Sequence, residues 1–182
     1  MAPEPPLYDI DAAVRARLPD ADPDVALLHL ATMRLGRVVE NALDRTLRTD
    51  GVDRSEHSVM AALWFAGPPH QLSPTQLSQA VVQTTSGMTK TIRRLEVAGF
   101  VTRTSDPDDG RGRLVVLTSA GARLVARQMR EFVAQWQEAL AAHEPSERAK
   151  LSSTLWVVLG AIEPSAPQLA VRQTHGASTA DD

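Results

Sequence analysis

The stretch that decides the fold runs from Ser73 to Gly121 and reads SPTQLSQAVVQTTSGMTKTIRRLEVAGFVTRTSDPDDGRGRLVVLTSAG. Its pattern predicts two short helices followed by two strands, and a charged turn that contains glycine joins the strands. This order is typical of a helix-turn-helix motif with a wing. Short polar side chains at a helix N-terminus can reach base edges, and basic side chains can reach phosphates. The stretch therefore predicts a protein that reads duplex DNA.

Local signals set the bounds of these elements. The SPTQ segment that starts at Ser73 follows the capping-box pattern, so the first helix begins there. The second helix begins near Thr84 or Thr85, and Gly99 ends it. Its expected buried face consists of Met88, Ile92 and Leu95. The two expected strands cover residues 100–104 and 113–117.

The candidate DNA contacts lie in three places of this motif. The second helix, which we call the recognition helix, supplies Thr84, Thr85, Ser86, Gly87, Thr89, Lys90, Arg93 and Arg94. The wing supplies Arg103, Arg111 and Arg113, and the start of the preceding helix supplies Ser73 and Thr75. An arginine at a hairpin tip can enter a narrow minor groove, where the potential is more negative. The alternatives are a solvated helix face, a polar turn and a helix cap without any DNA contact.

Long helices are expected on both sides of this motif. Apolar residues recur at helical spacing over residues 23–48, 55–65, 119–140 and 145–162. The expected N-caps are Asp22 before the first of these helices and Thr118 or Ser119 before the third. The last helix is too apolar to stand alone in water. Its partner is the first long helix, the same elements of a second subunit, or both.

These elements predict a mainly α fold with a small β-hairpin wing. The winged helix-turn-helix domain covers residues 51–118, and residues 23–50 and 119–163 form a helical region beside it. Residues 1–22 form an arm with a short helix over residues 7–18, and residues 164–182 form a disordered tail. The sequence has no nucleophile elbow, P-loop, dinucleotide-binding loop or HExxH motif, so an enzyme is not expected.

Composition narrows the function further. The chain has 182 residues, a formal net charge of −3 and no cysteine, which excludes disulfides, thiolate zinc sites and thiol-based redox sensing. The negative net charge is compatible with DNA binding, because residues 84–95 include three basic residues and no acidic one. The N-terminus lacks the pattern of a signal peptide, and no apolar run is long enough to cross a bilayer. We therefore expect a cytoplasmic protein without a membrane partner.

Four segments resemble the MarR family of winged-helix transcription regulators: SPTQL, TTSGMTK, RRLEVAGFVTR and DPDDGRGRLVVLTSAG. The resemblance extends over about residues 24–162. It implies a homodimer through residues 23–50 and 119–163, with each recognition helix in the major groove of a pseudo-palindromic operator. It also implies that Asp109 pairs with an arginine and holds the wing in shape. The resemblance predicts a repressor that a small molecule releases from DNA.

Family members commonly bind an effector between the dimerisation helices and the DNA-binding domain, and many of these ligands are aromatic anions. The candidate effector contacts are His29, Arg34, Arg37, His57 and Trp64. The alternative for each is a solvated, ion-paired or packing residue. The added N-terminal helix and the PPHQLSPTQL segment resemble the urate-responsive branch of the family. Val14 and Ser58 stand where that branch carries a tryptophan and an aspartate, which favours a different ligand.

Two further possibilities concern a metal site and a different partner. Neither a metal site nor a cofactor is expected, because the five histidines have no clustered spacing. The alternative function is a winged-helix module that binds another protein and not DNA. Such a module predicts an apolar patch on the recognition helix. A salt titration separates the two functions, because DNA binding weakens steeply with salt.

Overall fold

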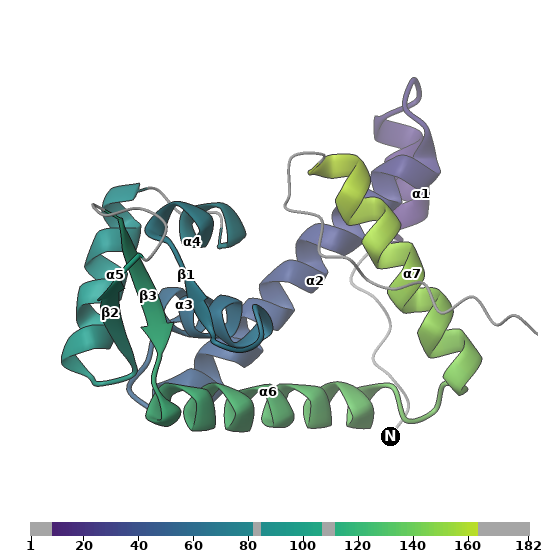
Figure 1. Cartoon of the computed structure of the whole chain (residues 1–182). Coiled ribbons are helices and arrows are strands. Elements are labelled where there is room, and N and C mark those ends of the chain that lie inside the picture. Colours follow the sequence, from purple (N-terminus) through teal and green to yellow (C-terminus); the bar gives the residue numbers. More distant parts are fainter. Residues whose placement is uncertain (1–8, 82–84, 107–111, 164–182) are drawn as a thin grey trace, which may run out of the picture. The chain divides into compact units, whose positions relative to one another are not determined.

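The computed structural model of the chain divides into two compact units, residues 1–54 and residues 55–182 (Figure 1). It describes residues 9–81, 85–106 and 112–163. This part of the chain is mainly helical with one small antiparallel sheet, so the predicted fold class is confirmed. None of the helices in these ranges is long and apolar enough to cross a membrane.

The first unit consists of α1 (Ile10–Arg17) and α2 (Pro23–Arg48), which pack against each other. Asp9 caps α1 and Asp22 caps α2, and their carboxylates accept hydrogen bonds from backbone N–H groups of the first turn. These N–H groups have no partner within the helix, so the caps stabilise both helix starts. Val14 of α1 is buried. The predicted N-terminal helix and the Asp22 cap are thus confirmed.

The second unit contains the winged helix-turn-helix motif and the last two helices. Its helices are α3 (Arg54–Phe65), α4 (Pro74–Ala80), α5 (Thr85–Val97), α6 (Ser119–Ala139) and α7 (Pro145–Ile162). Its strands are β1 (Gln71–Leu72), β2 (Val101–Ser105) and β3 (Arg113–Leu117), paired in the order β1-β3-β2. We call α3, α4, α5 and the sheet the reading head. In Figure 1 the reading head lies at the N-terminal end of α6.

The reading head has a continuous apolar core. The expected buried face of α5 is confirmed, since Met88, Ile92 and Leu95 are each 1% exposed. The other fully buried apolar side chains of this unit include Val59, Met60 and Leu63 of α3, Leu77 of α4, Val115 of β3 and Val125 of α6. Each buried side chain of this size contributes about 1.5–3 kcal/mol to stability. The reading head therefore holds α5 by packing within a single chain.

The end of α5 and the start of α6 meet at a hydrogen-bonded joint. Gly99 has a φ of +75°, and the N–H of Phe100 donates to the carbonyl oxygen of Leu95 (2.9 Å), as in a Schellman cap. Thr118 Oγ1 donates to the carbonyl oxygen of Gly99 (2.8 Å) and accepts from the N–H of Gly121 (3.1 Å). A Cβ atom on Gly121 would collide with the carbonyl oxygen of Phe100. The joint thus requires glycine at both positions.

Two details of the sheet differ from the prediction. The first wing strand begins at Val101 and not at Phe100, because Phe100 closes the Schellman cap of α5. The strand β1 was not predicted, since Gln71 and Leu72 form a strand only by pairing with β3. The start of the predicted arm (residues 1–8) and the predicted disordered tail lie outside the described residues.

Candidate nucleic-acid interface

The solvent face of α5 carries the largest group of expected DNA contacts. Ser86, Thr89, Lys90 and Arg93 are exposed there, and Gly87 is half-buried. The opposite face of the helix is the buried apolar stripe, as the i, i+4, i+7 spacing requires. The exposed face has hydroxyl groups near the helix N-terminus and cations further along. This arrangement suits contacts with base edges and phosphates.

Two of the expected arginine contacts have carboxylate partners inside the protein. Nε of Arg94 in α5 lies 3.0 Å from Oε1 of Glu56 in α3. Nε of Arg103 in β2 lies 3.1 Å from Oε2 of Glu96 in α5. The side chains of Arg94 and Arg103 remain 44% and 36% exposed. DNA contacts by these two arginines stay a prediction, and each arginine already joins two elements of the reading head.

The structure describes only part of the wing. Arg113 is exposed at the start of β3, where it pairs in register with Ser105 of β2. The tip residues Asp109 and Arg111 lie outside the described residues, as does Thr84 before α5, and the side chain of Thr85 is not described either. Their expected DNA contacts, and the pairing of Asp109 with an arginine, stay predictions.

The start of α4 is a reciprocal helix cap. Ser73 Oγ accepts a hydrogen bond from the N–H of Gln76 (3.2 Å), and Gln76 Oε1 accepts one from the N–H of Ser73 (2.8 Å). The capping box predicted from the sequence is therefore confirmed. Thr75 is exposed in the first turn of α4. Phosphate contacts by Ser73 and Thr75 stay a prediction.

Comparison with known proteins identifies the family. A model of the MarR family matches residues 50–112, which run from the end of the first unit into the wing. The transcriptional regulator PecS of Dickeya dadantii is 28% identical over 147 residues, covering 81% of this chain and 89% of PecS. Residues 50–112 thus form a MarR-family region of this chain. The relatives and structural neighbours are transcription regulators and not enzymes, which agrees with the expectation from the sequence.

Solved structures share the MarR fold of this chain. The MarR family transcriptional regulator Sco3205 from Streptomyces coelicolor, in complex with DNA, superimposes with a TM-score of 0.66 at 24% identity, covering 82% of this chain and 94% of that chain. NadR in complex with 4-hydroxyphenylacetate gives a TM-score of 0.62 at 17% identity, with coverage of 72% and 91%. At these identities the likeness concerns the fold.

The expected effector contacts of this protein lie on α2 and α3. His29, Arg34 and Arg37 are exposed on α2 in the first unit. Trp64 of α3 is half-buried, and its ring packs edge-on against Phe65 at a centroid distance of 5.0 Å. A joint effector site of these residues stays a prediction. Among the described residues, no three His, Cys, Asp or Glu side chains come together in a way that could hold a metal ion.

His57, the remaining effector candidate, has a buried partner inside the protein. Its Nδ1 lies 2.8 Å from Oε1 of Gln128 in α6, and its ring meets that of Phe132 edge-on at 5.3 Å. With the amide oxygen as acceptor, Nδ1 carries the proton. Burial lowers the pKa of His57, and the hydrogen bond with Gln128 offsets part of this shift. The neutral imidazole therefore links α3 to α6 near pH 7.

Sequence reasoning missed three polar residues that pair with side chains of the reading head: Glu56, Glu96 and Gln128. A signal for Glu96 was present, because it precedes the expected end of the recognition helix and Arg103 follows just after the turn. No such signal exists for Glu56 or Gln128. Each lies far along the chain from its partner, so only the tertiary fold brings the pairs together.

Proposed function

We propose that this MarR-family protein binds duplex DNA sequence-specifically through the solvent face of α5 and the wing. The polarity of α5 carries the proposal, because the helix exposes Ser86, Thr89, Lys90 and Arg93 while it buries its apolar stripe. A helix of this kind enters the major groove in winged helix-turn-helix proteins, and wing arginines suit the adjacent minor groove. The complex of Sco3205 with DNA supports the proposal. A regulator of this kind has to reach the chromosome, so a cytoplasmic location belongs to the same proposal.

The alternative module, which would bind a protein and not DNA, receives less support from α5. It predicts an apolar patch on the exposed face of the recognition helix. Val97 is an exposed apolar residue of α5, with 85% of its surface accessible, but it stands at the last position of the helix, beyond Lys90 and Arg93. The rest of the exposed face carries Ser86, Thr89, Lys90 and Arg93, so it is basic and rich in hydroxyl groups, which suits DNA.

The apolar surface of α7 supports a homodimer. Leu151, Leu155, Trp156, Leu159 and Ile162 each keep 39% or more of their surface exposed in the single chain. Large exposed apolar patches are typical of interaction surfaces. A second copy would cover these side chains and place two reading heads on one duplex. The operator would then be pseudo-palindromic, with half-sites about one helical turn apart.

The same proposal includes release of a repressor by a small aromatic or carboxylate ligand. NadR was solved with 4-hydroxyphenylacetate, a compound of this class. The exposed cations Arg34 and Arg37 on α2 suit the carboxylate of such a ligand. By linkage, a ligand that weakens DNA binding must itself bind more weakly to the DNA complex by the same factor. Arg34→Ala should keep DNA affinity and lose the response to phenolic carboxylates in a gel-shift assay.

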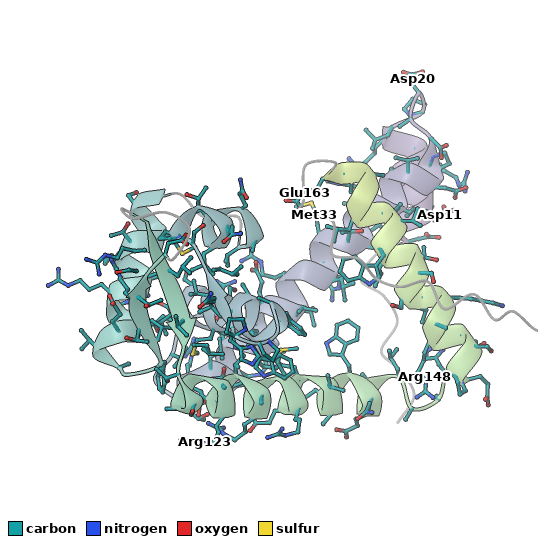
Figure 2. All side chains as sticks on the ribbon, in the orientation of Figure 1. Asp11, Asp20, Met33, Arg123, Arg148 and Glu163 are labelled. Atoms are coloured by element: carbon teal, nitrogen blue, oxygen red, sulfur yellow. The ribbon has the colours of Figure 1, made fainter. Side chains whose placement is uncertain are left out.

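Fluorescence anisotropy with a duplex selected from a random pool tests the DNA-binding function. The affinity of the unmodified protein should fall steeply as salt rises. Arg93→Ala should lower that affinity by about 1–3 kcal/mol if Arg93 reads a base, or reduce the salt slope by about one if it contacts a phosphate. Arg123→Ala is the matched control, since Arg123 is an exposed residue of α6 outside the reading head (Figure 2).

Other results would contradict either the DNA-binding function or the specific role of α5. If the unmodified protein selects no duplex from the pool, or if binding does not depend on salt, the DNA-binding function is wrong. An equal loss of affinity in Arg93→Ala and Arg123→Ala would instead show a general charge effect, without a specific role for α5.

A further inference from the structure

The two ion pairs of the reading head hold α5 from two sides. Arg94 ties α5 to α3 through Glu56, and Glu96 ties α5 to the wing strand β2 through Arg103. We propose that Glu56 and Glu96 are positioning residues of the DNA-binding site, which keep α5 and the wing in the orientation that reads DNA. This inference rests on the proposed DNA-binding function. It adds two acidic residues, which themselves repel phosphates, to the residues that support DNA binding.

Glu56 is largely buried, so its carboxylate depends on partners inside the protein. Its side chain is only 13% exposed, and a carboxylate at this depth needs a cation or several donors to offset the lost hydration. Arg94 supplies such a partner at 3.0 Å. The first turn of α3 adds a favourable helix dipole at the same carboxylate. Displacement of α5 from this position would take Arg94 away from this carboxylate.

The ion pair at the wing leaves the side chain of Arg103 partly exposed. A guanidinium carries five N–H donors in one plane, and Glu96 engages Arg103 through Nε. The Arg103 side chain is 36% exposed. Its Nη groups can therefore bind a phosphate while Glu96 fixes the plane of the guanidinium. A flexible arginine would lose more side-chain entropy for the same contact.

Apolar packing sets which face of α5 is buried, because Met88, Ile92 and Leu95 are each 1% exposed. The two ion pairs add directional contacts to this packing. A small rotation would move the exposed groups Ser86 and Thr89 relative to base edges. Ion pairs to two different neighbours, α3 and β2, oppose rotation in both senses.

A positioning role and simple charge repulsion predict opposite changes in DNA affinity when the carboxylate is removed. A carboxylate near DNA repels phosphates, so its removal should strengthen binding to every duplex. Removal of a positioning carboxylate should instead weaken binding to the selected duplex, because that binding depends on the register and orientation of α5. A duplex of shuffled sequence does not require that register. The ratio of the two affinities is therefore the quantity to measure.

The experiment compares Glu96→Gln and Glu56→Gln with the unmodified full-length protein. Affinities are measured for the duplex selected from a random pool and for a shuffled duplex of equal composition. We expect the ratio of selected to shuffled affinity to fall roughly fivefold in each variant, as for an ion pair near the upper end of its usual strength. Glu131→Gln is the matched control, because Glu131 pairs with Arg127 on α6. Its ratio should not change.

A double-mutant cycle separates positioning from general destabilisation. Arg103→Ala should lower the ratio in the unmodified background and have little further effect in Glu96→Gln. Arg103→Lys should behave like Glu96→Gln, because lysine keeps the charge but lacks the planar fork. Thermal unfolding of each variant measures whether the fold is retained. If Glu56→Gln unfolds, the Glu96 and Arg103 variants decide the result.

The outcomes distinguish this inference from the proposed function beneath it. If Glu96→Gln binds both duplexes more tightly by the same factor, the carboxylate only repels DNA and the positioning role is wrong. An equal loss on both duplexes would also overturn it. If the unmodified protein shows no salt-dependent duplex binding, the proposed function itself fails and the inference fails with it.

Discussion

The reading head and α7 have similar apolar contents but bury them differently. In the reading head, Val59, Leu63 and Leu77 are 0% exposed within a single chain. In α7, Leu155 and Leu159 are 43% and 42% exposed, and every residue of the helix is exposed or half-buried. Both regions have the apolar spacing of packed helices. Within the single chain, the reading head and the start of α6 therefore cover their apolar side chains, whereas α7 leaves its apolar side chains exposed.

This contrast has a consequence for how substitutions act. A change in the reading head should alter the free energy of unfolding of the chain itself. A change on the exposed face of α7 should alter association, so its effect should depend on protein concentration. The same chemical substitution can therefore be compared in both regions.

The largest effect should come from charges placed on α7. Leu155→Glu together with Leu159→Glu would bury two carboxylates in the proposed dimer interface, at a cost of several kcal/mol. We expect the mass in analytical ultracentrifugation to fall from dimer to monomer at micromolar concentration. Lys150→Glu is the control, since Lys150 is an exposed polar position of the same helix. A monomer mass for the unmodified protein would refute the dimer.

Leucine truncation compares the two regions directly. Leu63→Ala should lower the free energy of unfolding by about 2–5 kcal/mol, because it leaves a cavity in the core of the reading head. This loss should be independent of protein concentration. Leu155→Ala should cost less, and its cost should vanish on dilution below the dimer dissociation constant. Denaturant titrations at two protein concentrations measure both effects, and equal concentration-independent losses would contradict the contrast.

The joint beside the reading head should be sensitive to a single methyl group. Gly121→Ala should lower the free energy of unfolding by about 1–3 kcal/mol, since the new Cβ collides with the carbonyl oxygen of Phe100. Gly36→Ala is the matched control, because a Cβ there meets nothing within 4 Å. It should raise helix stability by up to about 1 kcal/mol. Thermal unfolding of both variants checks the difference, and a neutral Gly121→Ala would show that the joint relaxes.

Local chemistry explains which parts of this fold the sequence predicted. Asp22, Ser73 and Gly99 act on backbone groups within a few residues, so their roles as caps and helix end were readable from the sequence. The strand β1 escaped prediction because its two residues form a strand only through β3.

The candidate site divides in the same way. The exposed positions of α5, such as Lys90 and Arg93, follow from helical spacing and were predicted. The carboxylate partners of Arg94 and Arg103 were not, since an arginine count does not show which acids fold against it. Whether His57 is a ligand contact or a packing residue also depends on Gln128, which lies on a helix that follows the wing.

The smallest expected effect concerns the hydrogen bond between His57 and Gln128. Burial lowers the pKa of His57 in the folded protein, so the unfolded chain binds a proton at higher pH than the folded chain does. The contribution of neutral His57 is therefore fully present above about pH 6.5, the ordinary histidine value, and is lost as pH falls below it. Carboxylates titrate mainly below about pH 5, so the window between these values isolates histidines.

Denaturant titrations between about pH 8 and pH 5.5 test this assignment. The unmodified protein should lose stability as pH falls through that window. His57→Gln should start from a lower stability, because glutamine does not fill the imidazole site beside Phe132, but its stability should depend less on pH. His29→Gln is the control, since His29 is exposed on α2. It should keep the pH dependence of the unmodified protein. If His57→Gln and the unmodified protein have the same pH slope, the proton uptake belongs to another group, and His57 serves in packing alone.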